Sequence, residues 1–159
     1  NFHYVMDRDW WIRFLLYFGL NGIQKTNDIL VNFRSHPTSK TNSFLDKFDT
    51  EAHNLYYTIA TQHQLPEAKT LEEIWQTALV KDSNYKSTLS ITTLQKAMHN
   101  YFLQMALIAY AKDDYISAKK IIPHINTKML MIDDAQHLSK INNRIKFLPI
   151  WLKKIVQKK

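Results

Sequence analysis

The most regular hydrophobic pattern of the chain lies between Thr92 and Ile122. Apolar residues recur in its first half at steps of three and four, which is the spacing of a helix with a wide buried face. These residues are Leu94, Ala97, Met98, Tyr101, Phe102, Met105, Ala106, Ile108 and Ala109. A polar corner at 112–114 precedes a shorter helix, which should stop before Pro123 because proline lacks a backbone N–H. The pattern therefore predicts two antiparallel helices within 92–122, with Asp113 or Asp114 as the cap of the second.

The same spacing recurs more weakly elsewhere and predicts further helices near 10–18, 23–33, 43–63, 70–79, 133–148 and 150–159. Thr70 and Glu73 match a capping box for the fourth of these. Residues 34–42 combine Pro37 with Ser, Thr and Asn, which predicts an exposed loop. Two glycines and four prolines are few for 159 residues, and sheet proteins need many such turn residues. We therefore expect one all-α domain over 1–159, an irregular bundle of seven or eight helices.

The predicted pair at 92–122 resembles a single tetratricopeptide repeat. The residues that match its large, medium, small, aromatic, small and large packing positions are Phe102, Met105, Ala106, Tyr115, Ala118 and Ile122. The chain departs from the repeat at Ala109, Asp113 and Pro123, and no second copy follows at the 34-residue period. A generic antiparallel helix pair, with alanine where the two helices cross closely, explains the same spacing.

Charge is distributed unevenly along the chain. Residues 1–136 contain 14 Lys/Arg and 14 Asp/Glu, so their charges balance. Residues 137–159 contain seven Lys/Arg and no acid, so the whole net charge of +7 lies in this basic C-terminal segment, which we expect to be helical.

Two groups of residues are candidates for binding a partner. The aromatic run near the N-terminus, with Trp10, Trp11 and Phe14, exceeds what one helix face buries, so these rings either pack in the core or form a partner surface. In the basic C-terminal segment the candidates are Arg144, Lys146, Trp151, Lys153, Lys154 and Lys158. As a binding segment it would suit an acidic protein or a nucleic acid, and an anionic membrane less well. The alternative is a terminal helix that docks by its apolar stripe and keeps its lysines in water.

Residue patterns typical of catalysis are missing. The seven histidines include no H-x-x-x-H or H-E-x-x-H pair, and Asp133 with His137 is better explained by a helix cap and a surface histidine. The adjacent carboxylates Glu72/Glu73 and Asp113/Asp114 diverge on a helix instead of facing one another. Two glycines cannot build a phosphate-binding loop, and the absence of cysteine excludes thiol catalysis, disulfides and thiolate zinc sites. We expect no enzyme activity, no cofactor and no metal.

The sequence thus favours a non-enzymatic helical protein–protein interaction module, a subunit or adaptor of a larger assembly. The alternatives are a small basic nucleic-acid-binding subunit and a ligand-sensing helical domain cut from a larger receptor, which would explain why the chain starts at Asn1. The lack of cysteine slightly favours the cytoplasm but does not exclude export.

Overall fold

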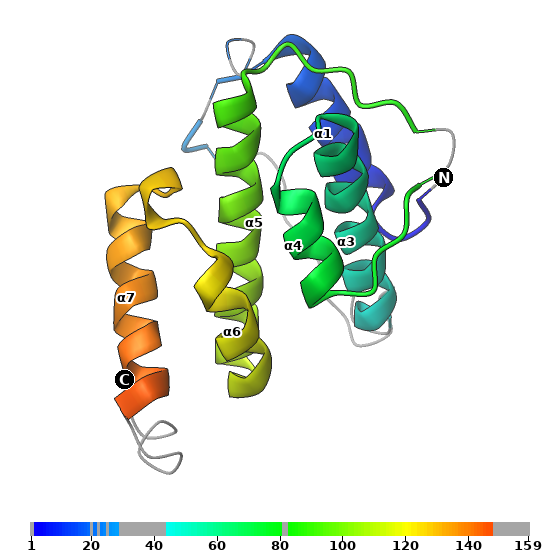
Figure 1. Cartoon of the computed structure of the whole chain (residues 1–159). Helices are drawn as coiled ribbons and strands as arrows, with labels where there is room; N and C mark the ends of the chain where they lie inside the picture. Colours follow the sequence, from blue (N-terminus) through cyan, green and yellow to red (C-terminus); the bar gives the residue numbers. More distant parts are fainter. Residues whose placement is uncertain are drawn as a thin grey trace. The chain divides into compact units, whose positions relative to one another are not determined.

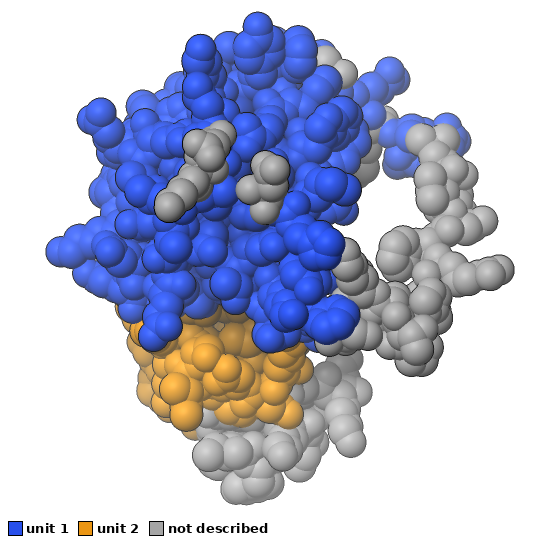
Figure 2. All heavy atoms as spheres, turned by 90° about the vertical axis from the view of Figure 1, so that its right-hand side faces the viewer, with its two compact units in different colours: residues 1–91 blue, residues 92–159 orange. Residues whose placement is uncertain are grey.

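The computed structural model of the chain describes residues 2–19, 21, 23–24, 26–28, 44–80 and 83–147. All regular structure in these ranges is helical, which confirms the predicted all-α class for them (Figure 1). The elements are α1 (Met6–Phe18), α3 (Leu45–Gln62), α4 (Glu67–Ile74), α5 (Ile91–Ala111), α6 (Tyr115–Ile121), the 3₁₀ turns η1 (Ile122–His124) and η2 (Thr127–Met129), and α7 (Ile132–Phe147). The chain divides into two compact units, residues 1–91 and 92–159 (Figure 2).

The first unit contains α1, α3, α4 and an irregular stretch after α4. Helix α3 matches the predicted helix at 43–63, and its buried face carries Ala52, Leu55, Ile59 and Ala60. Helices α3 and α4 lie side by side (Figure 1). Residues 76–80 and 83–90, which we call the connecting segment, have no helix before α5 begins at Ile91.

The predicted helix at 70–79 is wrong in both of its boundaries. Helix α4 begins at Glu67, directly after Pro66, whose φ of −61° is already suited to a helix, so Thr70 lies inside α4 and is not its cap. The helix ends at Ile74 because Trp75 is extended, with φ −125° and ψ 154°. Beyond it, the amides of Ala78 and Val80 bond to side chains of α3 instead of continuing a helix.

Other predicted elements fall partly or wholly outside the described residues. Within the helix expected at 23–33, the described residues 23–24 and 26–28 are not helical, and the rest of that range lies outside the description. The exposed loop at 34–42 and the helix at 150–159 also lie outside it. The expected total of seven or eight helices is therefore not confirmed, since the described ranges hold six α-helices.

In the second unit, α5 and α6 correspond to the two helices predicted within 92–122. Figure 1 shows the chain reversing direction between them. Asp114 caps α6 as expected, since its Oδ1 accepts a hydrogen bond from the amide of Ser117 at 3.0 Å. The hydroxyl and amide of Ser117 thereby hold the pKa of Asp114 below its ordinary value. Pro123 lies in η1, so α6 ends where proline predicted.

Two helices end in a left-handed turn that is formed by a residue other than glycine. Gln64 after α3 and Asp113 after α5 have φ of 54° and 60°. At the first turn the amide of Leu65 reaches Ala60 O at 2.8 Å, and that of Gln64 reaches Thr61 O at 3.1 Å. This is the paired hydrogen-bond pattern in which glycine is the favoured residue. A chain with two glycines therefore uses polar side chains at these turns.

The turn at Gln64 gives a direct test of this strain. Gln64→Gly should raise the free energy of unfolding by about 1 kcal/mol, because a left-handed backbone costs a non-glycine residue about that much. Gln64→Val should lower it, since a β-branched side chain tolerates this conformation worst. Urea unfolding of the natural chain and the two variants checks both signs. Equal stability of the valine and glycine variants would show that the left-handed turn stores no such strain.

Candidate binding surface on helix α1

A row of polar side chains on α3 holds the connecting segment in place. Asn54, Thr58 and Gln62 are spaced four residues apart and so share one face of the helix. Asn54 Oδ1 accepts from the amide of Ala78 at 2.8 Å, and Thr58 Oγ1 accepts from that of Val80 at 3.0 Å.

Gln62 completes this polar row with both ends of its amide. Its Oε1 accepts from the amide of Tyr85 at 2.9 Å, and its Nε2 donates to Ser83 O at 2.6 Å. His63 Nε2 donates to Tyr85 O at 2.6 Å. The backbone on both sides of Tyr85 is therefore held by α3.

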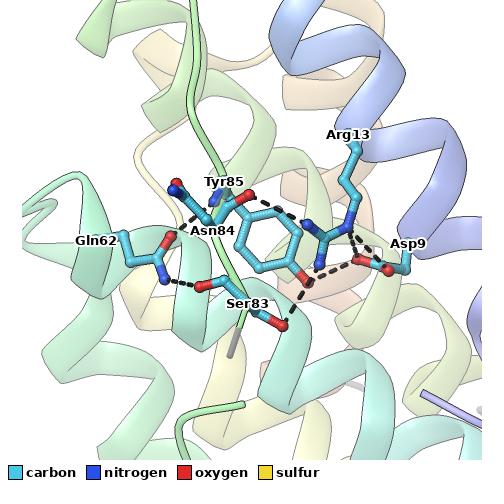
Figure 3. A network of polar contacts seen from close by, with 6 residues as sticks. All are labelled: Asp9, Arg13, Gln62, Ser83, Asn84 and Tyr85. Atoms are coloured by element: carbon cyan, nitrogen blue, oxygen red, sulfur yellow. Dashed lines mark hydrogen bonds and ion pairs between the residues drawn. The ribbon is translucent and has the colours of Figure 1, made fainter. Parts of the chain in front are cut away.

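Tyr85 links the connecting segment to α1 (Figure 3). Its hydroxyl donates to Asp9 Oδ1 at 2.6 Å. Arg13, one turn after Asp9, donates from Nε to both carboxylate oxygens at 3.0 Å and from a terminal nitrogen to Asn84 O at 3.1 Å. The guanidinium also lies over the Tyr85 ring, 4.3 Å from its centroid. One carboxylate thus receives hydrogen bonds from a phenol and a guanidinium.

The environment of Tyr85 keeps its phenol protonated. The side chain is 2% exposed, and burial raises the pKa of Tyr85, with the hydrogen bond to Asp9 raising it further. The hydroxyl is therefore available as a hydrogen-bond donor at any physiological pH, and its role is structural.

Both ends of α1 are also anchored by other parts of the first unit. At the N-terminal end, Glu51 of α3 accepts from the amides of Tyr4 and Val5 with Oε2, at 2.6 and 3.1 Å. At the C-terminal end, the amide of Thr88 donates to Leu16 O at 2.8 Å. Gly19 follows with φ 72° and ψ −166°, a conformation essentially restricted to glycine.

With its polar side anchored in this way, α1 exposes its aromatic side. Leu16 is the only buried residue within the helix. The rings form a continuous series, with centroids 5.0 Å apart between Trp10 and Trp11 and 4.9 Å apart between Phe14 and Phe18. Four of the five aromatic residues are more than half exposed: Trp10 59%, Trp11 54%, Tyr17 60% and Phe18 60%. We call Trp10, Trp11, Phe14, Tyr17 and Phe18 the aromatic face.

A pocket of about 630 Å³ opens beside the aromatic face. The helix contributes its apolar wall, and the connecting segment contributes the other. The lining residues are Trp10, Arg13, Phe14, Tyr17, Phe18, Asn84, Tyr85 and Lys86. The arrangement can take up an apolar group against the rings, with polar groups at the opposite edge.

The structure brings some of the predicted partner-binding residues together and leaves others untested. Trp10, Trp11 and Phe14 gather on the aromatic face, so the interpretation of this run as core packing is wrong for the two tryptophans. Arg144 and Lys146 lie on α7 in the second unit. The remaining candidates, Trp151, Lys153, Lys154 and Lys158, lie outside the described residues.

Sequence reasoning missed the residues that fix this surface. Asp9 and Arg13 carried a usable signal, since opposite charges four residues apart pair on a helix. Asn84 and Tyr85 carried none, because their partners lie about 70 residues away in the sequence.

His53 is a second buried titratable group in this unit. It is 9% exposed, and its ring stacks on that of Trp75 with centroids 4.2 Å apart and an interplanar angle of 17°. Burial lowers the pKa of His53 from its ordinary 6.5 to about 4, because the charged form loses its hydration. The imidazole is therefore a neutral packing group at neutral pH.

The described residues contain no cluster of three or more His, Asp or Glu side chains suited to a metal ion. In the same part of the chain, no helix is long and apolar enough to cross a bilayer. Comparisons of the sequence with protein-family models and with curated proteins, and of the fold with solved structures, find no match. The function must therefore be argued from the surface itself.

The hydrogen bond between Tyr85 and Asp9 can be tested by removing one atom. Tyr85→Phe should lower the free energy of unfolding by about 1.5–3 kcal/mol, because the carboxylate loses a charge-assisted bond. Tyr17→Phe is the matched control, since that side chain is 60% exposed and its change should stay within about 0.5 kcal/mol. Denaturant unfolding measures both, and equal effects would contradict the assignment.

Acid should destabilise the fold through His53. Above pH 6.5 the residue is neutral in both states, but between pH 6.5 and about 4 only the unfolded chain binds the proton. Its contribution therefore falls in this window, by up to about 1.4 kcal/mol per pH unit. His53→Phe keeps a flat ring against Trp75 and should flatten the pH dependence measured by urea unfolding. The same substitution at exposed His137 should leave the slope unchanged, and a slope insensitive to His53→Phe would refute the role.

Proposed function

We propose that the chain is a non-enzymatic helical interaction module that binds another protein through the aromatic face of α1, as a subunit or adaptor of a larger assembly. The observation that carries the proposal is a helix with five aromatic side chains, four of them more than half exposed, next to a pocket. Soluble proteins rarely expose contiguous apolar patches without a binding role. Tryptophan and tyrosine are also the residues that dominate binding energy at protein interfaces.

Charge near this surface favours a protein over a nucleic acid. The region carries two negative charges, on Asp7 and Asp9, and three positive charges, so it is almost neutral. The positive charges are those of Arg8, Arg13 and Lys86. Nucleic-acid binding draws mainly on Lys and Arg contacts to phosphates, and the two aspartates oppose such contacts. An apolar protein segment meets no such penalty.

The anchoring of α1 also supports a binding role. A hydrogen bond accepted by Glu51 and two donated by Tyr85 and Thr88 hold α1 at both ends and in the middle. A surface that is already fixed before it meets its partner loses less conformational entropy on binding.

The second unit contributes the rest of the proposed module. A tetratricopeptide-like pair formed by α5 and α6 would serve as its scaffold. Phe102 and Ala118 support this interpretation, since both matching positions are fully buried. Although Asp113 departs from the glycine that is common at this position of the repeat, its φ of 60° is a backbone conformation that glycine adopts readily. Arg144 and Lys146 would add a second, basic contact.

Site-specific photocrosslinking tests the proposed surface on the full chain. A photoreactive benzoylphenylalanine at Trp11 should give a discrete covalent adduct in cells that express the chain naturally. The same group at exposed Glu72 on α4 should not. The size of the adduct should be unchanged by nuclease, whereas an adduct with a nucleic acid would shrink to the mass of the chain with a short crosslinked remnant.

Two substitutions give the quantitative form of this test. Trp10→Ala and Phe18→Ala should each weaken binding of the identified partner by about tenfold to thirtyfold, as expected for a central aromatic contact. Both side chains are largely exposed, so the melting temperature should barely change. No adduct at position 11, or affinities unaffected by both substitutions, would refute the proposed function.

A further inference from the structure

A second groove, in the second unit, lies between the α6–η1 region and α7. Its volume is about 560 Å³, within the range of about 300–1,000 Å³ that is usual for binding pockets. Ile122, Ile125 and Leu138 line it with apolar side chains. All three are less than a tenth exposed, so they form a packed floor. The groove differs from the pocket on α1 in the charge along its rim.

Two lysines stand at the rim of this groove, Lys119 from α6 and Lys146 from the last turn of α7. None of the lining residues is acidic. Neither ammonium group forms an ion pair with the described residues. Residues 135–159 contain no Asp or Glu.

The two acids that directly precede α6 in the sequence form hydrogen bonds of their own. Asp114 caps α6 through the amide of Ser117. Asp113 accepts a hydrogen bond from the hydroxyl of Tyr115 at 2.6 Å. The positive charge at the rim is thus left for a ligand, while the floor below it is apolar.

We propose that this groove binds an acidic polypeptide segment that inserts one bulky apolar side chain. The apolar side chain lies on Ile122, Ile125 and Leu138, and flanking carboxylates pair with Lys119 and Lys146. The inference extends the proposed function to a second surface and rests on it only in that the ligand is a polypeptide.

The combination of floor and rim selects this partner chemistry. A phosphate backbone would use the two lysines and leave the apolar floor empty, and two cations give little phosphate affinity. An apolar segment without acids would fill the floor and bring no anion to the ammonium groups. An acidic segment with one large apolar residue satisfies both parts of the groove.

Fluorescence polarisation with designed peptides tests this pairing on the full chain. The probe is a labelled twelve-residue peptide of glutamates and glycines with a central Phe. Two matched peptides replace the Phe with Ser or all glutamates with Gln. We expect binding of the first peptide, a loss of about tenfold or more for each of the other two, and weaker binding at high salt.

Variants of the chain locate the binding. Lys119→Glu and Lys146→Glu should each weaken the acidic peptide by about tenfold, and Lys112→Glu, an exposed lysine outside the groove, should not. Ser139→Trp places a large side chain at a lining position without removing a core group, and should also block binding. Circular dichroism and melting temperature check that each variant folds.

Several outcomes would overturn the inference. They are no binding by the Phe peptide, equal binding by the Ser peptide, or a loss with Lys112→Glu as large as with Lys146→Glu. Binding of single-stranded RNA or phosphatidylserine vesicles that depends on Lys119 and Lys146, while the acidic peptide does not bind, would assign the groove to those ligands instead. Crosslinking at Trp11 is a separate readout, so failure here leaves the proposed function standing, and its failure leaves the peptide result interpretable.

Discussion

The first unit depends on how the backbone of the connecting segment finds hydrogen-bond partners. This segment has neither a helix nor a strand of its own to satisfy its amides. A backbone group without a ladder of its own must bond to water or to a side chain. Asn54, Thr58 and Gln62 supply such side chains from one face of α3. A polar face of α3 therefore fixes the course of the connecting segment, beside the apolar face that packs in the core.

The contacts of α1 combine polar and apolar groups. The connecting segment brings Tyr85 and Asn84 to Asp9 and Arg13, so that hydrogen bonds and an ion pair add to the burial of Leu16 in holding α1. A surface helix usually docks by an apolar stripe and leaves its charges in water. In α1, Leu16 is buried, and Asp9 and Arg13 are also engaged by the connecting segment, whereas four of the five rings are more than half exposed. Polar anchoring on one side of α1 therefore lies next to an exposed aromatic face on the other.

The pattern of neighbouring residues in the sequence predicts part of this structure. It fails where the structure depends on contacts between residues far apart in the sequence. Helical periodicity identified α3, α5 and α6, and the polar corner before α6 narrowed its cap to Asp113 or Asp114, because these features depend on residues within one or two turns. The capping box at Thr70 was wrong, because α4 already begins at Glu67, directly after Pro66. The predicted extension to residue 79 was also wrong, because the amides of Ala78 and Val80 bond to side chains of α3, more than 20 residues away in the sequence. Aromatic density drew attention to Trp10 and Trp11, but it did not decide between core packing and an exposed surface. The Tyr85 contacts join residues far apart in sequence, and no local signal marks them.

The two candidate surfaces differ in the force that would hold a partner. The aromatic face has nearly balanced charges around it, so its affinity would come from apolar burial, which salt affects little. The groove near α7 places two lysines over an apolar floor, so part of its affinity would come from charge and would be screened by salt. One neutral and one cationic surface cannot both prefer the same ligand chemistry. Under the two proposals, the chain would contact two chemically different segments, as an adaptor does.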